Sequence, residues 1–143
     1  QYGPTEHALV ERLDQELAVI RHHQEALELR KAAAAVRSVW KTANAYDAES
    51  APRSVIKHDR DRAAIVTRSA LNLVRLAASI AWPFIPRTAS LVLSTLGEHA
   101  DPPTWSVDGA TALSTLPAGR AFSVPPPLFP KITTASLTPA PSP

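Results

Sequence analysis

The uneven distribution of proline limits the possible folds of this chain more than any other feature. Most of its 14 prolines lie beyond Gly97, whereas the residues before Gly97 are rich in Ala, Leu, Val, Glu and Arg. Proline lacks a backbone N–H and its ring clashes with the preceding helical turn, so long helices are possible only before Gly97. We therefore predict a helical bundle over residues 1–97, a C-terminal arm over 98–132 and a Pro/Ser/Thr-rich tail over 133–143.

Apolar residues recur at helical spacing in the bundle region, which predicts two long helices at its start. The first helix follows an N-cap at Thr5 and carries the series Leu9, Leu13, Leu17 and Ile20. On this helix we expect four charged residues to face water, namely Glu6, Arg12, Asp14 and Glu16. After a joint near His22–Gln24, a second series runs from Leu29 to Tyr46 and stops at Ala51-Pro52.

Two further helices complete the predicted bundle. The third begins near Asp59 or Asp61, because a carboxylate suits a helix N-terminus. Its expected buried face is formed by Ala64, Leu71, Val74 and Ala78, and towards its end the helix becomes apolar almost all round. The fourth begins at Pro86 and ends at Gly97, which can adopt the left-handed conformation of a C-cap. Four helices with short connections predict an all-α, antiparallel helical bundle.

The arm after Gly97 keeps several large apolar residues despite its prolines. These residues are Trp105, Leu113, Leu116, Phe122, Leu128, Phe129 and Ile132. Because they are too apolar to remain in water, we expect an irregular arm that packs back on the bundle. The tail from Thr133 to Pro143 is poor in large apolar residues, and we predict that it is disordered.

Several classes of functional site are disfavoured by composition. The chain has no cysteine, and its four glycines are isolated from one another, so neither a thiolate site nor a phosphate-cradling loop is expected. No serine has the flanking glycines of a nucleophile elbow. We therefore predict no active site, no cofactor and no metal in this chain. His22 and His23 are adjacent, so on a helix they point about 100° apart and are interpreted as a solvated joint.

Cations concentrate around the second inter-helix turn and the start of the third helix. They are Arg53, Lys57, Arg60, Arg62, Arg68 and Arg75. Such a cluster can hold phosphates by charge-assisted hydrogen bonds. On composition alone the alternative is favoured, in which Arg60 and Arg62 pair with their neighbours Asp59 and Asp61. The formal net charge is only +2, so any contact with nucleic acid must be local.

The remaining residues that could carry function are aromatic. Trp82 and Trp40 adjoin the apolar series of their helices and are expected to lie in the core. Tyr46 could pack with its hydroxyl at the rim of the core, with Asn44 beside it as a cap or a ligand-binding residue. The longest apolar stretch, Leu76 to Ile85, is about half the ~20 residues needed to span a bilayer, so no membrane span is expected.

Short motifs follow one another along the chain in a fixed order. They are Leu27 to Ala32, Asn44-Ala45-Tyr46, Ala51-Pro52, Lys57 with Asp59, Pro83-Phe84-Ile85-Pro86, Leu96-Gly97, Trp105, Gly119 and Leu128 to Ile132. Each is weak alone, but their order resembles the helical anticodon-binding domain of class I methionyl-tRNA synthetases. The resemblance implies a tRNA-binding module in the cytoplasm, whose partners are the anticodon stem-loop of tRNA(Met) and the catalytic domain of a parent synthetase.

The resemblance also implies that the aminoacylation chemistry lies elsewhere. The signature motifs of the family's catalytic domain, His-Ile-Gly-His and Lys-Met-Ser-Lys-Ser, are missing here, so ATP and methionine would bind only to the parent's catalytic domain. A chain that begins at Gln1 and contains no methionine is expected to be a piece of something longer. The family's first anticodon-domain helix, which carries an Asn and an Arg that read the anticodon, would precede Gln1.

The resemblance places the candidate RNA-binding residues at the second inter-helix turn. Where the family carries Ala-Pro-Trp, with the Trp stacked on an anticodon base, this chain has Ala51-Pro52-Arg53. An Arg guanidinium can also stack on a base or clasp a phosphate. We predict Arg53 at a base or phosphate, Lys57 and Arg60 on phosphates, Asn44 near the binding end, and Pro52 shaping the turn. In the alternative, the chain is a diverged interaction module that has lost anticodon recognition.

Overall fold

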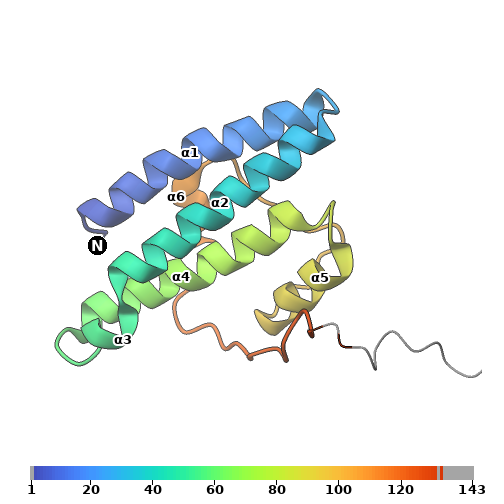
Figure 1. Cartoon of the computed structure of the whole chain (residues 1–143). Helices are drawn as coiled ribbons and strands as arrows, with labels where there is room; N and C mark the ends of the chain where they lie inside the picture. Colours follow the sequence, from blue (N-terminus) through green and yellow to red (C-terminus); the bar gives the residue numbers. More distant parts are fainter. Residues whose placement is uncertain (1, 132, 134–143) are drawn as a thin grey trace, which may run out of the picture.

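The computed structural model describes residues 2–131 and 133, and in these residues it is all-α and contains no strand. The helices are α1 (Pro4–Glu25), α2 (Leu29–Ser50), α3 (Pro52–Val55), α4 (Arg60–Ala81), α5 (Pro86–Thr95) and α6 (Gly109–Ser114). Figure 1 shows α1, α2 and α4 side by side, each antiparallel to the next, with α5 folded back on α4. The predicted antiparallel bundle is therefore confirmed.

The turn between α1 and α2 forms without glycine or proline. Leu27 adopts the left-handed conformation, with φ of 58°. The N–H of Glu28 donates to the carbonyl of His23 over 2.8 Å, which closes the C-terminal turn of α1 as a left-handed cap residue normally does. The helices therefore separate at Ala26–Glu28, a few residues after the joint predicted near His22–Gln24.

The central helix α4 buries only part of the predicted face, since Ala78 is buried and Leu71 is half-buried. Ala64 is exposed and 46% of Val74 is accessible, whereas the core contains Ala63, Val66, Leu73, Leu76 and Ile80. Most of these core residues lie on a different side of the helix from Ala64 and Val74. Because α4 is apolar on both, periodicity could not decide which face meets α2 and α6.

Length and composition alone would allow α4 to cross a membrane. Its 22 residues include an 18-residue window with a mean hydropathy of 1.3, of which 56% is buried inside the molecule. Core helices of bundles have the same composition, because neighbours surround them on several sides. Helix α4 packs against α2, α3, α5 and α6, so its place at the centre of the bundle accounts for its apolar character.

The first half of the arm packs on the bundle as predicted, but it contains a helix that was not predicted. Helix α6 packs against α1 and α4, and its Leu113 is completely buried. Polar side chains of α4 hold the segment that follows. Asn72 Oδ1 accepts a hydrogen bond from the N–H of Leu116 over 2.7 Å, and Arg68 Nε donates to the carbonyl of Leu116 over 3.1 Å.

Beyond Gly119 the arm departs from the prediction. Phe122 is 52% exposed, Leu128 38% and Phe129 71%, so these residues are not covered by the bundle. This last part of the arm is held to the bundle at Ser123, whose N–H donates to the carbonyl of Thr95 over 2.9 Å. Prolines at 125–127 and 130 remove N–H donors from the following segment, which limits further backbone pairing. Ile132 and the tail over 134–143 lie outside the described residues.

The two halves of the arm predict different mutational costs. Leu113→Ala should lower the free energy of unfolding by about 2–5 kcal/mol, because it leaves a cavity between α1, α4 and α6. Phe129→Ala, which removes an exposed side chain, should change it by less than about 0.5 kcal/mol. Urea unfolding followed by circular dichroism measures both. Equal, small effects would contradict the packing of α6 on the bundle.

Candidate nucleic-acid interface

The C-terminus of α2, all of α3 and the N-terminus of α4 meet at one end of the molecule (Figure 1). Ala51 joins α2 to α3 in the left-handed conformation, with φ of 40° and ψ of 59°. Pro52 follows as the first residue of α3, where its missing N–H costs no helical hydrogen bond. Asp59 caps α4 through a 2.8 Å hydrogen bond from the N–H of Arg62, as predicted for the start of this helix.

Three exposed cations cluster on this end, and we refer to Arg53, Lys57 and Arg60 as the α3 patch. Within the part of the chain that the structure describes, no hydrogen bond or ion pair joins these side chains to another residue. The patch is ordered by its backbone: the N–H of Asp59 donates to the carbonyl of Val55 over 2.8 Å. Three cations between residues 53 and 60 are therefore exposed, with their side chains uncommitted among the described residues.

The other cations of the predicted cluster serve the fold. Arg62 pairs with Glu6 and not with Asp61, so the ion pairs of the alternative reading do not form among the described residues. Arg68 donates to carbonyl groups of the arm. Arg75 donates to Glu98 Oε2 over 3.2 Å and to the carbonyl of Thr104 over 3.2 Å. The sequence cluster thus separates into the α3 patch and a set of structural arginines.

The remaining predicted site residues are Asn44 on α2 and Pro52 at the start of α3. Asn44 is exposed on α2, two turns before the helix ends, and makes no hydrogen bond to the described residues. Pro52 is half-buried at the start of α3. Geometry is compatible with roles for both residues near a ligand, but their roles stay predictions, as do those of Arg53, Lys57 and Arg60.

A buried carboxylate lies directly behind this end of the molecule. Glu6 is completely buried, and its two oxygens accept hydrogen bonds from Arg62 Nη1 and Nη2 over 2.6 and 2.8 Å. The Tyr46 hydroxyl donates to Glu6 Oε1 over 2.7 Å, and the N–H of Gly3 donates to Oε2 over 2.9 Å. This Glu6 junction joins the starts of α1 and α4 to the end of α2.

The prediction that Glu6 faces water was therefore wrong. Glu6 lies three residues before Leu9 and seven before Leu13, so helical spacing places it on the buried stripe itself. Tyr46 is only 3% exposed, and its hydroxyl lies inside the core and not at the rim. The periodicity could have located Glu6, but its partner Arg62 is 56 residues away and no sequence signal links them.

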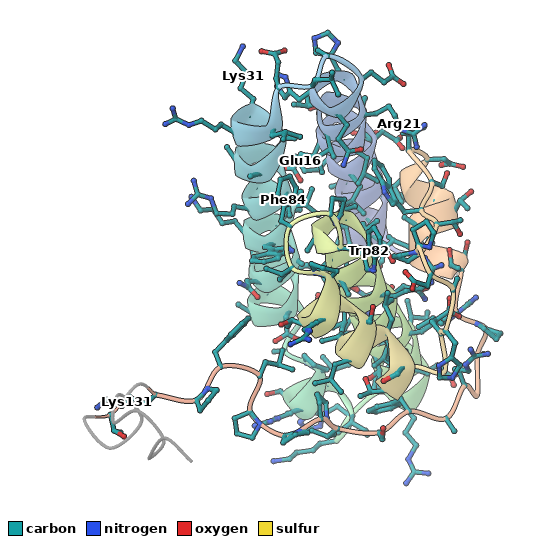
Figure 2. All side chains as sticks on the ribbon, turned by 90° about the vertical axis from the view of Figure 1, so that its right-hand side faces the viewer. Glu16, Arg21, Lys31, Trp82, Phe84 and Lys131 are labelled. Atoms are coloured by element: carbon teal, nitrogen blue, oxygen red, sulfur yellow. The ribbon has the colours of Figure 1, made fainter. Side chains whose placement is uncertain are left out.

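Glu16, also predicted to face water, is a second buried carboxylate of α1. It is 9% exposed and points into the space between α1 and α2 (Figure 2). Its Oε1 atom accepts hydrogen bonds from Arg12 Nε, Ser38 Oγ and Thr42 Oγ1 over 3.0, 2.9 and 3.0 Å. This carboxylate therefore links α1 to α2 halfway along the hairpin.

The tryptophans lie away from the α3 patch. Trp82 packs partly buried against Ala89 and Leu93, and Trp40 is 37% exposed with its Nε1 donating to the carbonyl of Ala77 over 3.2 Å. Trp105 packs against the core, and the Arg21 guanidinium lies 4.9 Å from its ring centre. Each indole therefore has a structural contact that explains its position.

The adjacent histidines lie on the last turn of α1, close to Glu28 in the turn that follows. Their ring centres lie 5.4 Å apart, and ligand atoms of His22, His23 and Glu28 lie within 4.8 Å of one another. Glu28 is already engaged, because Oε2 pairs with Lys31 and Oε1 lies 3.3 Å from His23 Nδ1. Hydrogen bonds from Lys31 and then His23 lower the pKa of Glu28. His22 is exposed and the other two residues are partly buried, and the contacts of Glu28 with Lys31 and His23 account for the cluster.

The contacts within the Glu6 junction shift the pKa values of its ionisable side chains. Burial alone would raise the pKa of Glu6, but hydrogen bonds from Arg62, Tyr46 and Gly3 lower it from 4.5 to about 2. Burial, and then the hydrogen bond to Glu6, raises the pKa of Tyr46 to about 12. The pKa of Arg62 is raised, chiefly by its hydrogen bonds to Glu6. All three shifts favour the charged pair Glu6–Arg62 with a neutral Tyr46.

The junction predicts how stability changes in acid. A folded-state pKa below the unfolded value means that the contribution of Glu6 is fully present above pH 4.5 and is lost as the pH falls towards 2. That contribution should be roughly 3 kcal/mol. Glu6→Gln should therefore be less stable than the parent at pH 7, and the difference should shrink between pH 4.5 and 2. Urea unfolding across this range measures it, and a constant difference would contradict the junction.

Comparison with known proteins gives consistent matches. A family model described as the anticodon binding domain of methionyl tRNA ligase matches residues 1–139. The methionine–tRNA ligase of Jannaschia sp. (strain CCS1) is 46% identical over 131 residues, which are 92% of this chain and 22% of that protein. The corresponding ligase of Cereibacter sphaeroides (strain ATCC 17025) is 44% identical over 132 residues, 92% of this chain and 23% of that protein.

A more distant relative gives the same picture. The methionine–tRNA ligase of Streptomyces avermitilis is 40% identical over 136 residues, which are 94% of this chain and 24% of that protein. The chain thus spans about a quarter of the length of the curated relatives that it matches.

Proposed function

The chain belongs to the family of anticodon-binding domains of methionyl-tRNA ligases, and from this premise we propose that the α3 patch binds the anticodon stem-loop of tRNA(Met). The observation that carries the proposal is the separation of the cations. Arg62, Arg68 and Arg75 are committed to the fold, while Arg53, Lys57 and Arg60 have no partner among the described residues. Uncommitted, clustered cations on an ordered backbone suit a phosphate backbone.

Arg53 is assigned the most specific role. It follows Pro52 at the first turn of α3, next to the left-handed Ala51, and its side chain is exposed. Its planar guanidinium can stack on an unpaired base and also donate several charge-assisted hydrogen bonds to a phosphate, whereas an indole has a single neutral N–H donor. Lys57 and Arg60 then bind phosphates of the loop, and Asn44 lies on the flank where it can hydrogen-bond a base edge. Pro52 fixes the backbone that directs Arg53.

We assign the aminoacylation reaction to a part of the protein outside this chain. In this proposal the bundle positions tRNA(Met) in the cytoplasm, and a catalytic domain outside residues 1–143 attaches methionine with ATP. No cofactor is assigned to the chain itself. The net charge of this chain is only +2, which is compatible with RNA binding because the proposal concentrates the attraction to RNA at one end of the bundle.

The phosphate role predicts a change in salt dependence. Lys57→Ala should weaken binding to an anticodon stem-loop hairpin and lower the slope of log K against log salt by about 1, because one phosphate contact is lost. Arg30→Ala is the matched control: Arg30 is an exposed cation of α2 near the opposite end of the bundle. Fluorescence anisotropy between low and physiological salt measures both. Equal effects of the two variants would argue against a localised interface.

The stacking role predicts a different outcome for Arg53. Arg53→Lys keeps the charge but loses the planar group, so it should preserve salt dependence while losing preference for a CAU anticodon over a changed anticodon. Loss of a stacked base should cost about 1–3 kcal/mol. Arg53→Trp, which restores an aromatic platform, should retain the preference.

These measurements also separate the proposal from its alternative. If the unmodified chain binds both hairpins equally and Arg53→Lys changes nothing, Arg53 does not read the anticodon. The diverged interaction module, which has lost anticodon recognition, would then be the better description.

A further inference from the structure

The turn between α1 and α2 gathers three side chains that can each donate a ligand atom to a metal ion. His22 and His23 lie on the last turn of α1, and Glu28 is the N-cap residue of α2. One ligand atom of each lies within 4.8 Å of the others, and no other such group occurs among the residues that the structure describes. The turn lies at the opposite end of α2 from the α3 patch (Figure 1).

The backbone of the turn fixes Glu28 beside His23. Leu27 is left-handed, with φ of 58°, and the N–H of Glu28 donates to the carbonyl of His23 over 2.8 Å. Between the two side chains, His23 Nδ1 and Glu28 Oε1 lie 3.3 Å apart. Two ligands of a tetrahedral zinc ion, each bonded over about 2.0–2.1 Å, are separated by about 3.3 Å. Two of the three ligand atoms therefore already have the spacing that a metal ion requires.

The contacts that hold the cluster together also leave it able to bind. Lys31 pairs with Oε2 of Glu28, so the other oxygen, Oε1, is the one that faces His23. Hydrogen bonds from Lys31 and then from His23 lower the pKa of Glu28, which keeps the carboxylate ionised at neutral pH. His22 is exposed and makes no hydrogen bond or ion pair with the described residues, so its ring is free to turn towards the other two ligands.

We propose that His22, His23 and Glu28 bind one divalent metal ion of the zinc class. Two imidazoles and one carboxylate form a mixed nitrogen and oxygen donor set, which suits Zn²⁺, Ni²⁺ or Cu²⁺, whereas Mg²⁺ prefers oxygen ligands alone. Three protein ligands leave a fourth position, which water fills because His22 lies at the surface. The ion cross-links the last turn of α1 to the first residue of α2, and it therefore stabilises the hairpin of these two helices.

Zinc binding by the tag-free chain tests this site. Isothermal titration calorimetry with ZnCl₂ at about pH 7.5, where an unperturbed histidine is mostly neutral, should show saturable binding of one ion per chain. His23→Ala and Glu28→Gln should each weaken the binding by at least about tenfold, since each removes a ligand. His99→Ala is the matched control and should change nothing, because His99 is an exposed histidine outside the cluster. MgCl₂ should give no heat of binding.

Two further measurements locate the ion and report its effect on the fold. In the ¹⁵N-labelled chain, Zn²⁺ should shift the amide signals of residues 22–31 and leave those of residues 51–60 unchanged. Zinc at about tenfold excess over its Kd should raise the melting temperature of the parent chain, because an ion that binds only the folded state stabilises it. The melting temperature of His23→Ala should not respond to zinc.

Several results would overturn the proposal. Heat that never saturates, binding that survives both His23→Ala and Glu28→Gln, or amide shifts centred on His99 and not on the turn would each mean that the cluster holds no metal. The substituted side chains lie on the surface turn and outside the core, so circular dichroism should show unchanged helix content in every variant. A loss of binding then reports a lost ligand and not a lost fold. None of these experiments contains RNA, so their failure would leave the anticodon-binding proposal untouched.

Discussion

The buried carboxylate of Glu6 is the interaction on which the candidate binding end depends. It is completely buried and receives hydrogen bonds from Arg62, Tyr46 and the N–H of Gly3, so it joins three helix ends that lie far apart in sequence. A buried charge left without its partner is strongly destabilising, typically by about 3–5 kcal/mol. Arrangements of the helices that separate Glu6 from Arg62 are therefore strongly disfavoured. Helix α3 connects the end of α2 to the start of α4. Its position, and that of Arg53, therefore follows from this junction.

The cations fall into two groups, those that form contacts within the fold and those that are exposed to solvent. Arg62, Arg68 and Arg75 hold α1 and the arm against α4, and their charge is largely used within the fold. Arg53 and Lys57 lie only a few residues earlier in sequence, yet they are exposed and uncommitted in the described structure. A local interface can therefore exist on a chain whose net charge is close to zero.

The sequence predicted those features that depend on local chemistry. Helical spacing located α1, α2 and α4, Asp59 marked the start of α4, and Pro86 lies at a helix N-terminus as expected. Pro52 follows the end of α2 as predicted, but it also begins the short helix α3, which was not predicted. Features that depend on distant partners were missed. Glu6 was placed in water although its spacing puts it on the buried stripe, because the partner that compensates its charge, Arg62, lies in another helix. Ala64 and Val74 of α4 were wrongly placed in the core because the helix is apolar on more than one side. Helix α6 was missed because it is only 6 residues long and its burial depends on α1 and α4. The candidate site was predicted as a cluster of cations, but which of them remain free could be learned only from the structure.

The measurement that tests the central claim most directly is a nuclear magnetic resonance titration of the ¹⁵N-labelled chain with an anticodon stem-loop hairpin that carries CAU. The account predicts that the amide shifts change mainly over residues 51–60, with smaller changes near Asn44 and none in the turn between α1 and α2. Shifts centred on Arg30 and Lys31, or shifts spread evenly over the bundle, would contradict it, since RNA binding would then not be located at the α3 patch.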